Sequence, residues 1–341
     1  MSGRISIHRR SDGAFITTIH AMTERSWVLN DEGKCTIQLS LTDAKNVRKY
    51  MGVRNFVYVT HDTLMPWGGV IETDEEWNSD NTITFTAFTG ESLLKTRTPL
   101  VGLINAASAG VLFTKLLALA NEPEVLLIRA GNISLTGSDA ELTLDGTDLL
   151  EAVKDLAKRR NMEFSIDPVV DAAGRMSFAA NWYEKAGSVK AYTLKEGYNI
   201  QRTSNPLRVQ RSVVNQLTGM GDASTDQRPT WTYIDQDSRG TYGLIQGVEN
   251  YDGVVNLETV KSHTLDGLNR KKQPRRTFRV EALNVDNTFG NLGKGNTLRL
   301  AAYSFGWLGD GAVGTDTSVR IFGMRYKDET DTCELTTDEV V

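Results

Sequence analysis

Apolar and polar side chains alternate in several short segments between residue 1 and about residue 99. The apolar positions are Ile5 and Ile7, then Ile37, Leu39 and Leu41, then Phe56 and Tyr58, and finally Ile83, Phe85 and Ala87. A spacing of two is typical of strands that bury one face. Turn-forming segments at 11–13, 30–33 and 74–81 separate them, at intervals typical of an antiparallel sandwich or barrel. The pattern therefore predicts an all-β first domain over residues 1–99.

The apolar spacing then changes to three and four residues, which indicates helices. One helix is predicted over 100–121, where a following proline ends the pattern. A second is predicted over 147–160, with one apolar stripe. Its cationic residues, expected to face water, are Lys154, Lys158, Arg159 and Arg160. The next alternating segment predicts a hairpin with its turn at 171–174, so residues 100–200 are expected to form a small α+β domain.

The alternating pattern returns at about residue 201 and continues in the last part of the chain. Between these parts, apolar residues at near-helical spacing predict a helix within 257–272 that ends before Pro274. We therefore expect a second β domain built from residues 201–232 and 275–341. Residues 233–274 form the inserted segment that carries the helix.

The composition is that of an ordinary soluble globular protein, with 40% apolar and 24% charged residues. A length of 341 residues favours several domains. The net charge of −5 argues against a protein that grips nucleic acid with a basic face. Cys35 and Cys333 cannot form a multi-bridge framework, which suits folding in a reducing cytoplasm. The polar, basic start predicts no signal peptide, and no apolar run is long enough to predict a membrane span.

The motifs that could carry chemistry are weak. The four histidines, His8, His20, His61 and His263, lack the paired spacing of a zinc hydrolase. GDGAVG at 309–314 matches a dinucleotide fingerprint, but a predicted strand follows it where a phosphate needs a helix. DQDSRG at 235–240 begins like a calcium loop, yet Gln246 stands in place of the bidentate glutamate, so a structural turn is favoured. We assign no catalytic, cofactor-binding or metal-binding residue.

Charge and exposed aromatic residues point instead to contacts with other proteins. Asp74, Glu75 and Glu76 lie beside Trp77 in a predicted hairpin. Adjacent carboxylates point apart, unlike the converging pair of a glycosidase, so an acidic hairpin tip is favoured over a catalytic site. In a ring of several copies this tip would point at a neighbouring subunit, and we predict an interface role for it on that basis. Two basic runs, 158–160 and 271–276, could contact phosphates or an acidic partner, although such runs are usually solvated faces.

A glycine-rich connection near the C-terminus carries three further candidates. Phe305, Trp307 and Leu308 lie in this segment, and exposed apolar residues in a hairpin often contact a partner. The alternative is that these side chains pack back on their own barrel. Both interpretations stay open at the level of the sequence.

Several motifs resemble the tail-hub proteins of tailed bacteriophages. These motifs are WGGVIE (67–72), ITFTAFTGESLL (83–94), SRGTYG (238–243), GKGNTLRL (293–300) and VRIFGMRY (319–326). The resemblance implies a mainly β protein with α+β insertions. Two tail-tube-type antiparallel β-barrels would be formed by 1–99 and by 201–232 with 275–341, and 100–200 and 233–274 would be two smaller accessory domains.

The same resemblance implies a structural role without enzymatic activity or cofactor. Three copies would form a ring that matches a hexameric tail tube, and the ring would leave a channel for DNA or a tape-measure protein. Its neighbours would be the tail tube or a distal tail protein ring and a tip or spike protein. The protein would be assembled in the host cytoplasm and located in the virion tail, and DNA would pass the mildly acidic wall without specific binding.

Two other functions are weighed against this one. A carbohydrate-binding tail adhesin of β domains would use exposed aromatics such as Trp77, Trp231 or Trp307. A cell-wall hydrolase would need carboxylates brought together from remote positions, and the sequence carries no lysozyme or peptidase motif.

Overall fold

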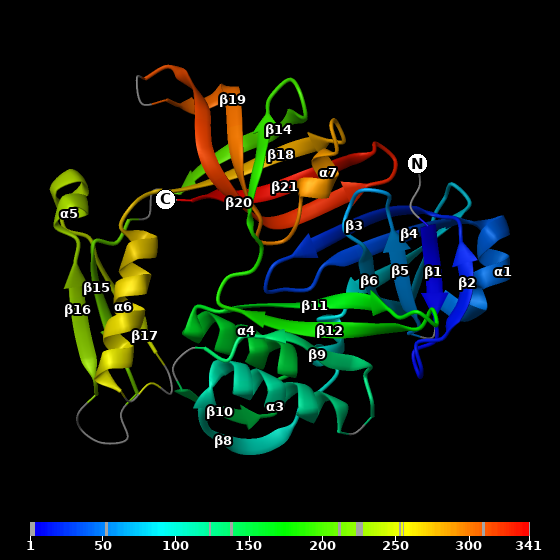
Figure 1. The fold of residues 1–341 in the computed structure, drawn as a ribbon, viewed down its shortest axis with the longest axis horizontal. Helices are drawn as coiled ribbons and strands as arrows, with labels where there is room; N and C mark the ends of the chain where they lie inside the picture. Colours follow the sequence, from blue (N-terminus) through cyan, green and yellow to red (C-terminus); the bar gives the residue numbers. More distant parts are fainter. Residues whose placement is uncertain are drawn as a thin grey trace.

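The computed structural model describes residues 4–340 apart from 52–53, 123, 137–138, 211–212, 223–227, 252–253, 255 and 309–310. Strands dominate this part of the chain, and the largest sheet contains 13 of them (Figure 1). Seven come from the first part: β1 (Arg4–His8), β2 (Phe15–Ile19), β3 (Met22–Val28), β4 (Lys34–Ser40), β5 (Phe56–Thr60), β6 (Trp67–Trp77) and β7 (Thr82–Thr89). Six come later: β13 (Val189–Lys195), β14 (Ile200–Gln210), β18 (Arg275–Leu283), β19 (Thr297–Trp307), β20 (Val313–Lys327) and β21 (Thr332–Glu339).

The two groups of strands are joined in one sheet. The strand order is β14-β18-β21-β20-β3-β4-β7-β6-β5-β1-β2, and β19 pairs with both β13 and β20. Antiparallel pairing of β3 with β20 makes the junction, from Val28 opposite Gly323 to Glu24 opposite Lys327. All these pairs are antiparallel except β13 with β19. The mainly β prediction is confirmed, and among the described strands the pairing is an open path in which neither group closes on itself.

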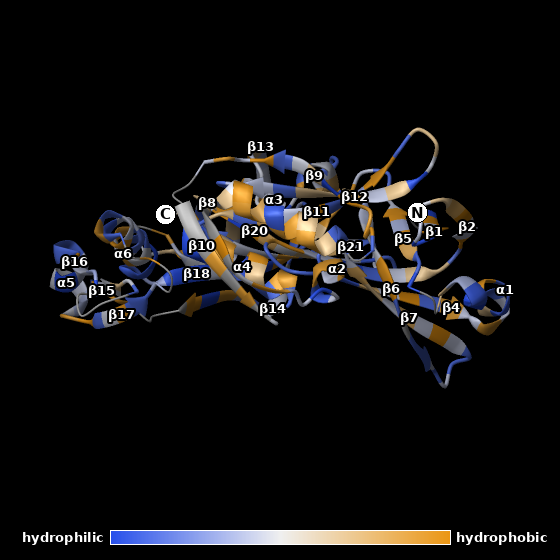
Figure 2. Cartoon of the chain, turned by 90° about the horizontal axis from the view of Figure 1, so that it is seen from below, coloured by the Kyte–Doolittle hydropathy of each residue, from blue (hydrophilic) through white to orange (hydrophobic). Residues whose placement is uncertain are grey.

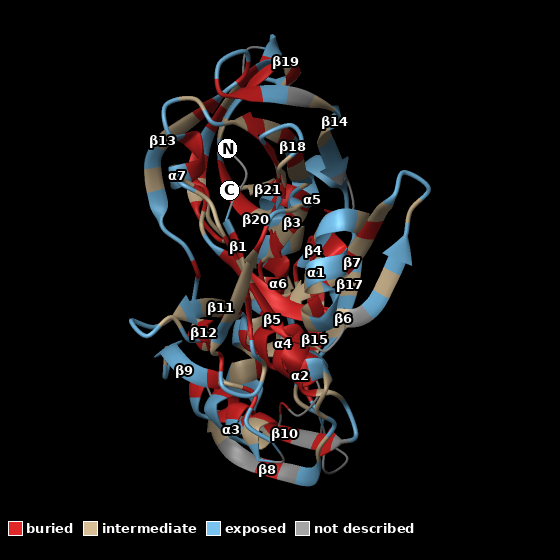
Figure 3. Cartoon of the chain, turned by 90° about the vertical axis from the view of Figure 1, so that its right-hand side faces the viewer, coloured by how far each residue is buried: buried red, intermediate tan, exposed pale blue. Residues whose placement is uncertain are grey.

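The alternating positions predict the buried faces of these strands correctly. Phe85 in β7 and Ile37 in β4 are opposite each other and fully buried. They belong to one core cluster that also contains Val280 and Ile321 from the later group of strands. The buried residues gather in the middle of the molecule, along β20, β3 and β4 (Figure 3). Both cysteines lie in this core, where burial raises the pKa of each thiol to about 12.

The first 99 residues are not all-β as expected. Leu41 ends its strand pattern and begins α1 (Leu41–Met51), because the Ser40 hydroxyl accepts a hydrogen bond from the Asp43 N–H and starts the helix. The short helix α2 (Ser92–Lys95) follows β7.

The α+β segment contains two main helices. α3 (Ala109–Asn121) and α4 (Leu149–Arg160) pack together under the hairpin of β11 (Glu163–Val170) and β12 (Met176–Tyr183). The rings of Phe113 and Trp182 stack with their centroids 4.9 Å apart. β9 (Ile128–Ile133) runs parallel to β12. The hairpin and its turn at 171–174 agree with the prediction.

Two details of this segment differ from the prediction. The residues before Ala109 form strand β8 (Leu100–Ser108) rather than the start of a helix, since they pair with β10 (Asp139–Asp145), a contact that local spacing cannot reveal. Arg160 is buried instead of facing water. It lies against the inserted segment, with Nη1 3.4 Å from His263 Nε2.

The inserted segment forms a small separate sheet. β15 (Gln216–Met220) lies between β16 (Thr230–Ile234) and β17 (Gln246–Asn250), and the predicted helix, α6 (Leu257–Lys271), covers them. The sequence pattern placed β15 with the second β domain, but β15 pairs here instead. A side chain on Gly219 would have its Cβ 1.9 Å from Thr264 Oγ1, so this helix approaches the sheet as closely as only glycine permits.

The two remaining short helices form where the sequence is rich in turn-forming residues. DQDSRG starts α5 (Gln236–Tyr242), where Asp235 caps the helix by accepting from the Ser238 N–H at 2.9 Å. α7 (Thr288–Asn291) lies between β18 and β19. The described part of GDGAVG leads directly into β20, as the sequence predicts, while residues 309–310 lie outside the described residues. Within the described residues, no helix is both long and apolar enough to span a membrane.

The molecule is elongated. β1–β7 and α1 lie toward one end of the long axis, whereas β15–β17, α5 and α6 lie at the other, in two views at right angles (Figures 1 and 2).

Candidate functional site

The acidic residues lie in a strand and not in the turn that the sequence predicts. β6 continues through Trp77 because antiparallel pairing with β7 persists, with Glu75 opposite Phe85 and Trp77 opposite Ile83. The turn itself is confined to residues 78–81, where the Asn78 N–H donates to the Thr82 carbonyl at 2.9 Å. We call residues 72–81 the acidic hairpin end. It projects from the body of the protein beside α1 (Figure 2).

The three carboxylates of the predicted interface differ in their contacts. Glu75 is held by Arg48 of α1, whose Nε lies 2.8 Å from Oε2, and by the Trp77 indole N–H at 3.2 Å. The hydrogen bonds from Arg48 and Trp77 lower the pKa of Glu75. Asp74 and Glu76 are exposed, and neither forms an ion pair within the described part of the chain. Trp77 is 61% exposed, so an aromatic surface and two unpaired charges remain available there.

The three apolar candidates of the C-terminal hairpin differ in their exposure to solvent. Phe305 is buried in the core, with its ring centroid 6.3 Å from that of Phe278, which supports for this residue the alternative that its side chain packs back on its own chain. The register of β19 against β20 shifts between Ala302 and Trp307. Trp307 and Leu308 are exposed, at 67% and 37%. Their role as an interface stays a prediction.

Trp307 borders a groove that the sequence did not indicate. This groove of about 550 Å³ runs between the ends of β14, β18 and β21 and the helix α5. Val209, Tyr242 and Val340 expose apolar surface along it. The residues come from distant positions in the chain, so no local pattern could have grouped them.

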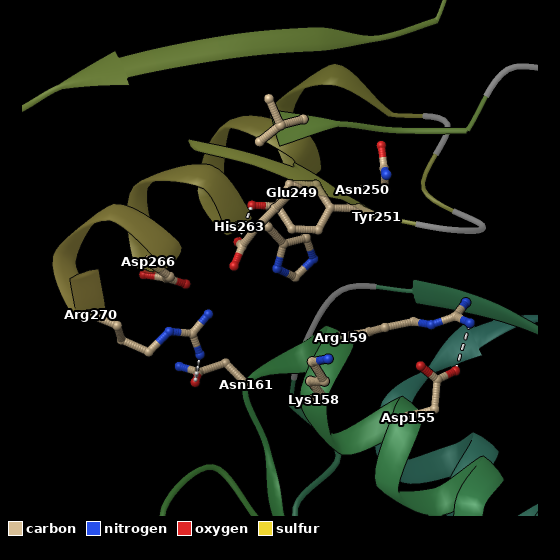
Figure 4. Close-up of a pocket in the computed structure, with 11 residues that line it drawn as sticks. Asp155, Lys158, Arg159, Asn161, Glu249, Asn250, Tyr251, His263, Asp266 and Arg270 are labelled. Carbon is tan, nitrogen blue, oxygen red and sulfur yellow. Dashed lines mark hydrogen bonds and ion pairs between the residues drawn. The ribbon is translucent and has the colours of Figure 1, made fainter. Parts of the chain in front are cut away.

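A polar cleft of about 350 Å³ separates α4 from α6 (Figure 4). From α6, His263 and Arg270 face the C-terminal end of α4. Arg270 donates to Asn161 at 3.1 Å, directly across the cleft. Burial lowers the pKa of His263, and the nearby Arg160 lowers it further. This histidine is therefore held in its neutral form near pH 7.

Two of the three carboxylates that line this cleft are paired with cations. Asp155 lies 2.6 Å from Arg159, and Glu249 lies 2.6 Å from Lys271. Burial on its own would raise the pKa of Glu249, but hydrogen bonds from Lys271 and Tyr251 lower it overall. A catalytic acid of a glycosidase needs a raised pKa. Among the described residues, no group of three or more His, Cys, Asp or Glu is placed to hold a metal ion.

A second cleft adjoins the first and is mainly basic. Four cationic side chains and one carboxylate, Glu249, line its volume of about 510 Å³. The cations are Lys158, Arg270, Lys271 and Arg275. Lys158 comes from the first basic run of the sequence, and Lys271 and Arg275 come from the second, directly after Arg270, so the two distant runs meet here. We call this site the basic cleft.

Comparison with known proteins relies on structure, since no protein-family model and no curated protein matches the sequence. The prophage tail protein gp18 from Listeria monocytogenes EGD-e superposes over 98% of this chain and 94% of its own, with a TM-score of 0.64 and 10% identity. The chain has the fold of a prophage tail protein. The 43 kDa tail protein of prophage MuSo2 from Shewanella oneidensis shares that fold over 98% of both chains, with a TM-score of 0.64 and 11% identity.

This tail-protein fold also occurs outside phages. The Escherichia coli c3393 protein, a component of the type VI secretion system with structural similarity to the T4 bacteriophage tail proteins gp27 and gp5, matches 99% of this chain and 77% of its own. The TM-score is 0.54 and the identity 11%. The structural resemblance that the sequence motifs suggested is therefore confirmed.

Proposed function

We propose that this protein is a structural component of a phage tail, a hub that connects the tail tube with the tail tip. The observation that carries the proposal is the match of the whole fold to prophage tail proteins, over 98% of this chain and nearly all of theirs. A match of this extent includes the accessory units as well as the large sheet. The gp27-like fold of c3393 supports the hub position in particular.

The proposed plan has four units. In this plan the strands β1–β7 correspond to the first tube-type unit, and β13, β14 and β18–β21 to the second, each as an open part of the large sheet. The predicted accessory units, 100–200 and 233–274, are adjusted in this plan, because β13 pairs with β19 of the large sheet and β15 pairs with β16 and β17 of the small sheet. Pairing of β3 with β20 holds these two units side by side, which supports a ring of three chains with six copies of the unit.

The ring would leave a channel for DNA or a tape-measure protein. A net charge of −5 favours a channel through which DNA passes over one that binds DNA, because strong attachment to phosphates requires many cationic contacts. The tail tube or a distal tail protein ring would contact one face of the ring, and the tip or spike protein the other. The location in the virion tail and the structural, non-enzymatic role follow from the same proposal.

The assembly state tests this function. Mass photometry of the purified chain, followed by electron cryomicroscopy of the particle, is expected to show a threefold ring with an axial channel. A chain that stays monomeric at all concentrations and is absent from the tail would overturn the proposal.

A carbohydrate-binding adhesin is the second candidate, favoured by the exposure of Trp77 and Trp307. Trp231 fits this role less well, because the ammonium of Lys261 lies 4.4 Å from its ring centroid and occupies one face. Glycan-array binding that is lost on Trp307→Ala would support the adhesin. Absence of binding to every glycan, together with an intact ring, would favour the hub.

A further inference from the structure

The acidic hairpin end is a concentrated negative charge with few internal partners. Five carboxylates and no lysine or arginine occur between residues 72 and 81. Arg48 engages Glu75, and Arg54 lies 3.9 Å from Glu72. Asp74 and Glu76 remain exposed beside the indole of Trp77. A partner for this segment must therefore offer cations around an apolar floor.

The basic cleft has this composition. Within the described part of the chain, neither Lys158 nor Arg270 forms an ion pair with a carboxylate, and both side chains are exposed. Val214 and the aliphatic parts of Lys271 and Arg275 supply apolar surface between the charged groups. Such a cleft suits a segment that combines carboxylates with an aromatic ring.

The two surfaces cannot meet within one chain. The hairpin end belongs to the β1–β7 end of the long axis, and the basic cleft lies beside α6 at the other end (Figures 1 and 2). Complementary patches at opposite ends of a molecule give head-to-tail contacts, which close into a ring when the rotation between copies permits it.

We propose that the acidic hairpin end of one copy docks into the basic cleft of a second copy. This inference rests on the proposed ring and identifies the contact that closes it. Asp74 and Glu76 pair with Lys158 and Arg270 of the neighbouring chain, and Trp77 covers the apolar floor. The contact is electrostatic at its rim, so assembly weakens as salt shortens the Debye length to about 3 Å near 1 M.

A charge exchange between two chains tests the contact. Glu76→Lys and Lys158→Glu, each alone, place like charges together and are expected to weaken assembly by roughly 100-fold. The double variant Glu76→Lys/Lys158→Glu restores the opposite charges and is expected to form the ring again. Mass photometry over a concentration series measures the ring fraction, and circular dichroism confirms that each variant is folded.

Matched controls come from two exposed positions of the α+β segment. Lys115→Glu on α3 and Glu122→Lys at the C-cap of that helix make the same charge changes away from both surfaces, and both variants should assemble like the wild type. Normal assembly of both single variants would overturn the contact while leaving the ring intact. Folded single variants that lose the ring, with no recovery in the double variant, would also overturn it.

Two further outcomes separate the alternatives. A wild-type chain that forms no ring would overturn the proposed function together with this contact. Normal assembly of Lys158→Glu with loss of affinity for a single-stranded oligonucleotide would overturn the contact and assign the basic cleft to phosphate backbone.

Discussion

Arg25 in β3 and Asp328, directly after β20, form a buried ion pair with Nη1 3.1 Å from Oδ1. Their side chains are only 1% and 2% exposed. Asp328 also accepts the Thr23 N–H at 2.8 Å, and the guanidinium of Arg25 lies 4.4 Å from the ring centroid of Tyr326. The pair lies where the two groups of strands meet, so it links the halves of the large sheet across about 300 residues of sequence.

Removal of this carboxylate should destabilise the junction strongly. Asp328→Asn leaves the charge of Arg25 buried without its counter-charge, which we expect to cost about 3–5 kcal/mol of the free energy of unfolding. Urea denaturation followed by tryptophan fluorescence measures the change. If Asp328→Asn does not fold, the double variant Arg25→Met/Asp328→Asn provides a second test, since it removes both buried charges and is expected to be more stable than Asp328→Asn.

The exposed pair Glu24 and Arg325 provides the matched control. It joins the same two strands but is about half exposed, and surface ion pairs contribute about 0–1 kcal/mol. Glu24→Gln is therefore expected to leave stability nearly unchanged. If Glu24→Gln and Asp328→Asn lowered the free energy of unfolding equally, the claim that burial strengthens the ion pair at this junction would be contradicted.

His263 should make the protein less stable in mild acid. Burial and Arg160 lower its pKa in the folded chain, while Asp266 and Glu249 oppose and Arg270 adds to this effect. As the pH falls, His263 of the unfolded chain therefore binds its proton at a higher pH than His263 of the folded chain does. The stability from this group is complete above the ordinary histidine pKa of about 6.5 and is lost as the pH falls below it.

Comparison of unfolding free energies at about pH 7.5 and about pH 5.5 tests this. The wild type is expected to lose more stability over this interval than His263→Gln. His8 and His61 also have pKa values lowered chiefly by burial, so part of the loss persists in the variant. His20→Gln changes an exposed histidine and should keep the wild-type difference. An unchanged pH dependence in His263→Gln would argue against the prediction.

The close packing of α6 on its sheet should be sensitive to one methyl group. Gly219→Ala would place Cβ against Thr264 Oγ1 and the Tyr251 ring, so a loss of about 1–3 kcal/mol is expected from overpacking. Gly240→Ala is the control, because its Cβ would meet no atom within 4 Å and alanine favours the helix α5. Thermal melting compares the two, and a tolerated Gly219→Ala would show that the helix can shift outward.

Truncation of Phe305 should lower the stability of the protein far more than truncation of Trp307. Phe305→Ala leaves a cavity in the core and is expected to cost about 3–5 kcal/mol. Trp307→Ala removes an exposed ring and should change stability by less than about 0.5 kcal/mol. If Trp307 is an interface residue, Trp307→Ala reduces binding to a partner in the tail while stability stays the same. Co-assembly with particle proteins measures this binding. A large stability loss in Trp307→Ala would contradict its exposed position.

Local pattern was sufficient where one element buries one face. The spacing of Ile83, Phe85 and Ala87 predicted β7, and the stripe over 147–160 predicted α4, since these side chains face the core whatever their exact neighbours. Strand β8 was missed because a strand is stabilised by its partner, and β10 begins about 30 residues later. Helix α1 was missed because the apolar Leu41 seemed to continue the preceding strand.

For the candidate site, the sequence identified exposed and charged stretches but not which of them lie together in the folded chain. The acidic run, Trp77 and Trp307 could be named from residue type alone. The burial of Phe305 could not, because the register of β19 against β20 shifts after Ala302 and local spacing does not show which of two nearby aromatic residues faces the core.

By itself, the sequence determined that this chain is mainly β and carries helices within 147–160 and 257–272, because side-chain periodicity and turn residues act locally. Several of its motifs also resemble those of tail-hub proteins. Only the tertiary structure decided that β3 pairs with β20 and that the two basic runs around Lys158 and Arg275 line one cleft. Such contacts join residues more than 100 positions apart. Their free energy comes from burial and charge pairing across the folded chain, which no local pattern encodes.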